Sequence, residues 1–201
     1  MFHINGYKLA EELYISRNST VLRARRQSNG MPVVLKRLNE PTPERLAWFR
    51  REYDLTQSLA DVPGSINVYG IEQHPAGWVL VLEDIGGDSL ARLRLAGALD
   101  LRTVLRLAAD LTRTLGEIHQ RRIIHKDINP ANIVYHPQSQ QVKLIDFGLS
   151  TKLAREITTF RSATVLEGTL HYLAPEQTGR MNARWTIAAT FMPSVSRCMS
   201  C

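Results

Sequence analysis

Alternating apolar and polar residues, interrupted by turn-forming residues, dominate the chain up to Glu83. Runs of this kind have the two-residue period of a half-buried strand. They predict strands at Tyr7–Ile15, Val21–Arg26, Pro32–Lys36, Ile66–Gln73 and Trp78–Glu83. Between the third and fourth runs, Thr42-Pro43-Glu44 has the hydroxyl cap, proline and early acid of a helix start, so a helix is predicted to about Leu59. A small antiparallel sheet with one helix is expected.

The apolar spacing changes after a Gly86-Gly87 connector. From Leu101 onward, apolar residues recur every three or four positions, which predicts a long buried helix. The residues on this spacing are Leu101, Val104, Leu105, Ala108, Leu111, Leu115 and Ile118. Two short strands, Ile133–Tyr135 and Val142–Ile145, then form a hairpin around the turn at 137–141. The predicted class is α+β, with a sheet-rich first part and a helical second part.

The charge distribution argues against a nucleic-acid partner. The chain has 201 residues and a formal net charge of +6, but residues 177–201 contain three arginines and no acid. The remaining excess is small, and the cluster Arg23, Arg25 and Arg26 is interpreted as a solvated strand face. No aromatic residues alternate with it, as stacking on bases would need.

The sequence also argues against a membrane partner. No apolar run approaches the roughly 18 residues that a membrane-spanning helix needs, and the start lacks a signal-peptide pattern. The cysteines, Cys198 and Cys201, lie in the last four residues, so the body of the chain uses no disulfide. A cytoplasmic location is expected.

Two short polar motifs carry the candidate chemistry. His125-x-Asp127 is followed four residues later by Asn132, and Asp146-Phe147-Gly148 comes after the predicted hairpin. Phosphoryl transfer needs a carboxylate that orients a hydroxyl and accepts its proton, and cations that neutralise phosphate charge. Asp127 suits the first role, whereas Asn132 and Asp146 offer the hard oxygen ligands that Mg²⁺ prefers. Either motif alone would be an ordinary loop; the ordered pair favours phosphoryl transfer.

Residues 7–176 resemble a protein Ser/Thr kinase domain. The phrases His-Lys-Asp-Ile-Asn-Pro-Ala-Asn-Ile-Val at 125–134 and Gly-Thr-Leu-His-Tyr-Leu-Ala-Pro-Glu-Gln-Thr-Gly-Arg-Met-Asn at 168–182 carry the resemblance. It is strongest to the kinase domains that begin large bacterial proteins and precede an ATPase module and a sensor histidine kinase. It implies a two-lobed fold, ATP and Mg²⁺ as cofactors and a protein substrate. The implied organisation is an N-lobe at 7–85, a partial C-lobe at 86–182 and a non-kinase tail at 183–201.

The resemblance also implies roles for individual residues. Lys36 would hold the α- and β-phosphates and pair with Glu52, with Glu44 as the second choice of partner. Asp127 and Asn129 would be catalytic, and Asn132 and Asp146 would hold the metal. The expected nucleotide contacts are Ser16, Ser19, Val21, Val34, Lys36, Leu82, Glu83 and Ile85.

Several positions depart from the family pattern. Tyr14, Ser16 and Ser19 stand where a glycine-rich phosphate loop has its glycines, so the loop should hold ATP less well or through hydroxyl groups. Lys126 replaces an arginine, which weakens the case for control by activation-loop phosphorylation, although Thr158, Thr159, Ser162 and Thr164 could accept phosphate. Asn129 replaces a lysine that contacts the transferring phosphate. Thr169 resembles the threonine that favours Ser/Thr substrates.

The tail after Asn182 continues no kinase helix, and a frameshift is expected. One permitted back-translation of Arg184–Cys201, read two bases out of phase, gives Met-Asp-Tyr-Arg-Ser-Asp-Phe-Tyr-Ala-Leu-Gly-Val-Thr-Leu-Tyr-Glu-Leu-Leu. By the resemblance, a kinase domain should continue here with a buried helix whose aspartate braces the catalytic loop. The alternative string has the pattern of this helix and contains the aspartate. One nucleotide inserted after codon 182 restores it, and the term frame-restored protein is used for that product. Codons at 182–184 that cannot encode the string would contradict the hypothesis.

Loss of the supporting helices should lower the stability and the activity of the 201-residue chain relative to the frame-restored protein. Each fully buried apolar side chain stabilises a fold by about 1.5–3 kcal/mol, against a net stability of about 5–15 kcal/mol. The chain is therefore expected to be poorly soluble or partly molten, with weak or no activity.

Two other functions stay open: a nucleotide-binding pseudokinase or regulatory module, and a small-molecule phosphotransferase, which shares the loop at 125–132. The segment from Asp146 to Glu176 favours protein substrates.

Overall fold

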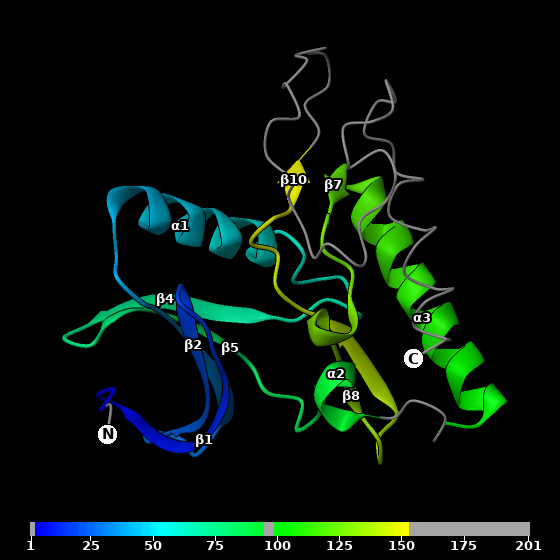
Figure 1. Cartoon of the computed structure of the whole chain (residues 1–201), viewed down its shortest axis with the longest axis horizontal. Coiled ribbons are helices and arrows are strands. Elements are labelled where there is room, and N and C mark those ends of the chain that lie inside the picture. The colour runs from blue at the N-terminus through cyan, green and yellow to red at the C-terminus, as the bar shows by residue number, and fades with distance from the viewer. Residues whose placement is uncertain (1–2, 95–98, 153–201) are drawn as a thin grey trace, which may run out of the picture. The chain divides into compact units, whose positions relative to one another are not determined.

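The computed structural model describes residues 3–94 and 99–152 (Figure 1). The chain divides into two compact units. The N-terminal unit comprises Met1–Asp61 and Ile66–Gly86, and the C-terminal unit comprises Val62–Ser65 and Gly87–Cys201. Antiparallel sheets and separate helices make up the described elements, so the predicted α+β class is confirmed.

The N-terminal unit is built on one antiparallel sheet of five strands in the order β1-β2-β3-β5-β4. The strands are β1 Tyr7–Ile15, β2 Ser19–Arg26, β3 Pro32–Leu38, β4 Val68–His74 and β5 Gly77–Glu83. All five were predicted, with errors of up to two residues at their ends. β2 begins earlier than predicted because Ser19 pairs with Leu38 of β3. β4 begins later because the preceding Ser65 forms a parallel bridge with Leu144 instead.

The helix α1, Pro43–Gln57, connects β3 to β4. It starts as the sequence predicts, because the Thr42 hydroxyl accepts the backbone N–H of Arg45. It ends two residues before the predicted Leu59, which is fully buried in the turn that follows. The length was overestimated because a buried leucine beyond a helix end keeps the apolar spacing of the helix.

The two faces of the sheet bury separate apolar clusters. One cluster consists of Ile4, Tyr7, Leu22, Ala24, Val33, Leu35, Val79 and Val81. On the opposite face, Leu38 and Leu80 pack with Phe49 of α1. Alternation along each strand explains this division, because successive side chains point to opposite faces. The helix therefore covers one end of its face and leaves the other end to polar and half-buried residues.

The C-terminal unit combines short strands with helices. Its described elements are β6 Asp88–Ser89, α2 Leu90–Leu93, α3 Leu101–Gln120, β7 Ile123–Ile124, the 3₁₀ helix η1 Pro130–Asn132, β8 Ile133–His136, β9 Gln141–Leu144 and β10 Thr151–Lys152. The strands form a sheet β6-β8-β9 and a pair β10-β7. The hairpin and the long helix were predicted. The two-residue strands and the one-turn helices were not, because segments this short carry no periodic pattern.

The helix α3 corrects one expectation, because it is buried over only part of its length. Leu115 and Ile118 in its second half are 5% and 0% exposed, whereas Leu101 and Leu105 in its first half are 67% and 56% exposed. Among the described residues, α3 contacts mainly β7 and β9. These strands cover the second half of the helix, and the sequence spacing alone does not tell which apolar turns are covered.

Residues 62–65 hold the β8–β9 hairpin next to α3. The carbonyl of Gly64 accepts the N–H of Leu144 at 2.7 Å, and the buried Lys143 ammonium donates to the carbonyl of Ser65 at 3.0 Å. A Cβ on Gly64 would collide with the Thr114 side chain of α3. This segment therefore needs glycine in order to bring the hairpin close to the helix.

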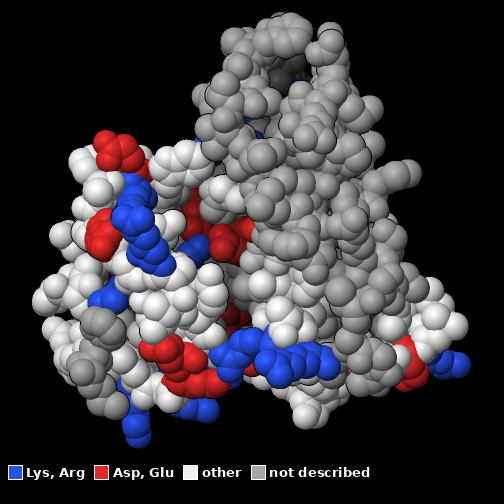
Figure 2. Space-filling model, viewed as in Figure 1, with Lys and Arg blue, Asp and Glu red and all other residues white. Residues whose placement is uncertain are grey.

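Charged side chains of both signs are interspersed over the described residues on the face shown in Figure 2. Some of the charged side chains form ion pairs: Arg23 lies 3.0 Å from Glu11 and 2.9 Å from Asp84. Arg25 donates to the carbonyl of Gly30. Within residues 3–94 and 99–152, no helix has the length and apolar character needed to cross a membrane.

Candidate active site

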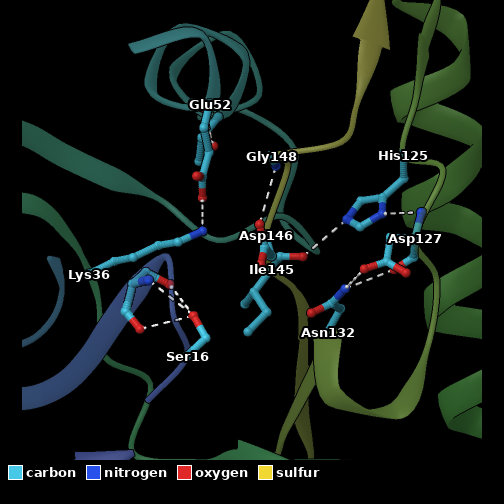
Figure 3. Close-up of polar contacts among 11 residues, drawn as sticks. Ser16, Lys36, Glu52, His125, Asp127, Asn132, Ile145, Asp146 and Gly148 are labelled. Carbon is cyan, nitrogen blue, oxygen red and sulfur yellow. Dashed lines mark hydrogen bonds and ion pairs between the residues drawn. The ribbon is translucent and has the colours of Figure 1, made fainter. Parts of the chain in front are cut away.

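An ion pair joins the sheet and the helix of the N-terminal unit. The Lys36 ammonium on β3 lies 2.6 Å from Glu52 Oε1 on α1, and both side chains are largely buried, at 13% and 9% exposure (Figure 3). Glu44, the second choice of partner, is instead exposed in the first turn of α1. There, backbone and Thr42 hydrogen bonds lower its pKa. The pair thus forms between the two residues predicted first.

An apolar platform lies on the same sheet face as Lys36. It consists of Val21, Val34 and Leu82, which are all half-buried. Val34 is directly opposite Leu82 in the strand register, and Val21 is directly opposite Lys36. Residues that face each other across strands, or lie two apart on one strand, share a face. The platform is therefore a flat apolar surface with an ammonium group at one edge.

The end of β5 is fixed beside this platform by Asn67, the residue that precedes β4. The N–H of Glu83 donates to the carbonyl of Asn67 at 2.9 Å. Its carboxylate accepts the backbone N–H and the side-chain amide of Asn67, at 3.2 and 3.1 Å. Glu83 and the half-buried Ile85 thus begin the segment that leaves the sheet.

The turn between β1 and β2 is closed by its own serine. The Ser16 hydroxyl accepts the N–H groups of Asn18 and Ser19 at 3.2 and 3.0 Å, and the Ser16 N–H donates to the carbonyl of Ser19 at 2.8 Å. Asn39 braces the turn from outside, because its amide donates to the carbonyl of Ser16 at 3.0 Å. The backbone N–H groups of Ser16, Asn18 and Ser19 therefore form hydrogen bonds within the turn. In a glycine-rich loop, such N–H groups would bind phosphate instead.

In the C-terminal unit, His125 and Asn132 hold Asp127 from two sides. The Asn132 amide donates to both the carbonyl oxygen and the carboxylate Oδ2 of Asp127, each at 2.9 Å (Figure 3). His125 Nδ1 accepts the N–H of Asp127 at 3.3 Å, so Nε2 carries the ring proton and donates to the carbonyl of Ile145 at 3.0 Å. The neutral imidazole therefore links the loop after β7 to the loop after β9.

Phe147 ties the Asp146-Phe147-Gly148 motif to the same imidazole. It is fully buried. Its ring packs edge to face against the His125 imidazole, with the two ring centroids 4.9 Å apart. Asp146 adopts a left-handed conformation with φ of 63°, and its Oδ1 accepts the N–H of Gly148 at 3.2 Å. Lys126 is also left-handed, with φ of 69°. A lysine in this conformation is strained by roughly 1–2 kcal/mol, so the surrounding contacts must hold the loop in place.

The Asn132 and Asp146 side chains offer oxygen ligands for a cation. Asp127 presents only acceptor atoms to the Asn132 amide, so the NH₂ group must face Asp127 and the amide oxygen points away from it (Figure 3). An amide oxygen and a carboxylate form the hard oxygen set that suits Mg²⁺. The residues present thus fit the metal that the sequence predicted.

Asn129 has a local structural role. It is 5% exposed, and its side-chain oxygen accepts the N–H of Ala131 at 2.8 Å, which caps η1. Asn39 and Asp84 were missed by the sequence analysis. Asn39 could have been found only from its place next to a strand end. Asp84 stands two positions before a glycine, a common setting for a carboxylate that accepts a backbone N–H.

Some predicted positions lie outside the described residues. These are Thr158, Thr159, Ser162, Thr164, Thr169, the Ala174-Pro175-Glu176 motif and the tail at 183–201. Of the other predicted site residues, the structure brings together Lys36 with Glu52 in one unit. In the other unit it brings together His125, Asp127 and Asn132.

Acid is expected to destabilise the fold through two buried histidines. Burial lowers the pKa of His125 below its ordinary value of 6.5, although its hydrogen bond to Ile145 and two nearby carboxylates act in the opposite direction. Burial also lowers the pKa of His119 in α3. As the pH falls through about 6.5, the unfolded chain binds protons that the folded chain resists. The free energy of unfolding should therefore decrease from pH 7 to pH 5.

Urea denaturation of the frame-restored protein at a series of pH values measures this effect. The double variant His119→Asn, His125→Asn serves as the control, because it lacks both imidazoles. Its free energy of unfolding should change less over the same pH range. An undiminished dependence in the double variant would assign the effect to other groups.

Comparison with known proteins shows the family of the chain. Residues 7–188 match the family model described as the protein kinase domain. Serine/threonine-protein kinase PrkC of Bacillus subtilis is 32% identical over 130 residues, which cover 64% of this chain and 19% of that protein. A probable serine/threonine-protein kinase of Clostridium acetobutylicum is 27% identical over 177 residues, 86% of this chain and 26% of that protein.

A third relative, serine/threonine-protein kinase PknB of Mycobacterium tuberculosis, is 32% identical over 134 residues. The match covers 64% of this chain and 21% of that protein. The chain thus spans about a fifth to a quarter of the length of these curated relatives. The family model covers most of the chain and includes both groups of candidate site residues. This chain therefore belongs to the protein kinase domain family.

Proposed function

We propose that this chain is the catalytic domain of an ATP-dependent protein serine/threonine kinase. The observation that carries the proposal is the Asp127 carboxylate, held at 2.9 Å by Asn132 in a loop fixed by His125. A carboxylate with one oxygen bound to an amide keeps a defined direction and can accept a proton on its other oxygen. This is the group that transfer to a serine or threonine hydroxyl requires.

The other predicted residues would divide the work of binding. Lys36, oriented by Glu52, would neutralise the α- and β-phosphates. The apolar platform would take the flat face of adenine, and the backbone of Glu83 and Ile85 would bind its edge. Asn132 and Asp146 would hold Mg²⁺, which offsets phosphate charge when it is bound.

The proposed phosphate contacts at Ser16 and Ser19 are weaker than those of a glycine-rich loop. The Ser16 hydroxyl already accepts two backbone N–H groups, and the Ser19 hydroxyl lies 3.4 Å from it. Asn129 is proposed to shape the catalytic loop by capping η1. Because it stands in place of a lysine, the transferring phosphate would lack the positive charge of that lysine. A slow kinase is the expected consequence.

The wider context is also a proposal. The domain organisation is proposed as an N-lobe at 7–85, a partial C-lobe at 86–182 and a frameshifted tail at 183–201. By the resemblance described above, the parent protein is proposed to be cytoplasmic and to continue into ATPase and sensor histidine kinase modules. Its substrate is proposed to be a protein. Weak or no transfer is expected of the 201-residue chain itself.

Replacing Lys36 with methionine tests the proposal. We expect the frame-restored protein to transfer ³²P from MgATP to a generic Ser/Thr-containing protein, and the variant to lose about a hundredfold or more in kcat/KM for ATP. The loss follows from removing the Lys36 ammonium, which lies at the edge of the apolar platform. Lys8→Met is the matched control, because Lys8 is an exposed lysine on a strand of the same sheet.

The competing function is a regulatory module that binds nucleotide without transferring phosphate. The closed turn at Ser16 is the observation that favours it. Thermal shift with ADP, with and without Mg²⁺, separates the two functions when it is combined with the transfer assay. A Mg²⁺-dependent shift with no transfer in the frame-restored protein would establish the regulatory module and contradict the kinase.

A further inference from the structure

A buried carboxylate just after β5 connects three separate parts of the N-terminal unit. The Asp84 side chain is only 6% exposed, although it follows the last strand residue. Its Oδ2 accepts Arg23 Nε of β2 at 2.9 Å, and its Oδ1 accepts the N–H of Gly86 at 2.8 Å. Both oxygens are therefore used, one by a neighbouring strand and one by the chain that follows.

The bond to Arg23 reaches across the sheet. Arg23 is directly opposite Val34 of β3, and Val34 is directly opposite Leu82 of β5. The guanidinium therefore spans the width of β3 to reach Asp84, beside two residues of the apolar platform. The Arg23 and Asp84 side chains are 24% and 6% exposed, so water and salt screen their attraction less than that of a surface pair.

The bond to Gly86 fixes the direction in which the chain leaves the sheet. Gly86 has φ of 74°, a conformation that glycine adopts without the cost that other residues incur. A carboxylate that accepts the N–H two residues later closes a turn of this kind. On the other edge of β5, the Glu83 carboxylate is bound by Asn67, the residue that precedes β4. Residues 83–86 are thus tied to β2 on one side and to the residue before β4 on the other.

We infer that Asp84, supported by Arg23, is a positioning residue for nucleotide binding. It fixes the backbone of residues 83–86, so the groups proposed to bind the adenine edge are in place before the ligand arrives. The inference rests on the proposed nucleotide-binding function. It adds that affinity at this site depends on a side-chain pair that does not touch the nucleotide.

The test uses Asp84→Asn in the frame-restored protein, because the 201-residue chain is expected to be partly molten. Asparagine keeps the shape and can still accept the Gly86 N–H, but it loses the charge that holds Arg23. Hydrogen exchange measured by mass spectrometry should become about tenfold faster for the amides of residues 84–86. The Kd for ADP, measured by calorimetry with Mg²⁺, should rise about three- to tenfold because the site is less preorganised.

Two further variants make the result specific. Arg23→Gln should reproduce both changes, and the double variant should be no worse than either single one, as expected for two residues that act as a pair. Glu40→Gln is the matched control, because Glu40 forms an ion pair of the same 2.9 Å length with Arg45 on the surface of the same unit. In the frame-restored protein, Asp84→Asn should raise KM for ATP and leave kcat nearly unchanged.

Each contrary result has a separate meaning. Unchanged exchange in Asp84→Asn would overturn the inference, because residues 83–86 would then not depend on the carboxylate. Faster exchange with an unchanged Kd for ADP would overturn it as well, since the backbone would be fixed without effect on binding. Failure of the unsubstituted protein to bind ADP would instead refute the proposed function, whatever the variants do.

Discussion

Replacing Asp127 with asparagine is expected to slow phosphoryl transfer by the frame-restored protein by about 10²- to 10⁴-fold and to leave ADP binding intact. Asparagine can still offer an oxygen to the Asn132 amide, which donates to Asp127 Oδ2 at 2.9 Å, so the loop keeps its geometry. It cannot accept the proton of a substrate hydroxyl. The measurement is single-turnover transfer of ³²P from MgATP at saturating nucleotide.

Asp110→Asn provides the matched control for this experiment. Asp110 is a carboxylate of the same unit that pairs with Arg113 on the surface of α3, at 2.8 Å. Its replacement should change transfer by less than about twofold, because surface ion pairs contribute little. Retention of more than about a tenth of the transfer rate in Asp127→Asn would mean that another group accepts the proton.

Replacing Gly87 with alanine is expected to destabilise the fold by about 3 kcal/mol, near the upper end of the usual cost of overpacking. A Cβ at this position would lie 2.6 Å from the carbonyl oxygen of Tyr135 and 3.0 Å from the nitrogen of His136. Both atoms are backbone atoms of β8, so no side chain can move aside to make room. Urea denaturation of the frame-restored protein measures the loss.

Gly116→Ala is the matched control, and its expected effect has the opposite sign. Gly116 lies within α3, and apart from its own stretch of helix no atom of the described residues comes within 4 Å of the position a Cβ would take. Alanine is favoured over glycine inside a helix by roughly 0.5–1 kcal/mol, so this variant should be more stable. Equal stabilities for the two variants would contradict the close contact between residue 87 and β8.

Much of the fold could be predicted from the sequence, because its longer elements are periodic. The five strands and the two long helices were predicted, and errors at their ends arose where a neighbouring segment decides the pairing. Ser65 shows this, because its bridge to Leu144 ends the pairing that would have extended β4. The burial of α3 could not be predicted, because Leu101 and Leu115 have the same spacing but differ in exposure, at 67% and 5%.

The candidate site was predictable to the extent that its chemistry lies in short motifs. The Lys36–Glu52 pair and the contact between Asp127 and Asn132 join residues that the sequence analysis singled out. The Arg23–Asp84 pair was not predictable, because its members are 61 residues apart and no sequence pattern links them. The cap that the Asn129 side-chain oxygen forms on η1 was missed, although Asn129-Pro130 has the cap residue and first-turn proline of a helix start.

The closed turn at Ser16 has a consequence for the thermodynamics of ligand binding. A flexible loop loses conformational entropy when it orders over a ligand, and this loss offsets part of the enthalpy of the new contacts. The turn between β1 and β2 is already held by the Ser16 hydroxyl and by Asn39, so little of this loss remains. Ordering of this turn would therefore add only a small entropic penalty to nucleotide binding at the proposed site, and the turn would supply few new contacts.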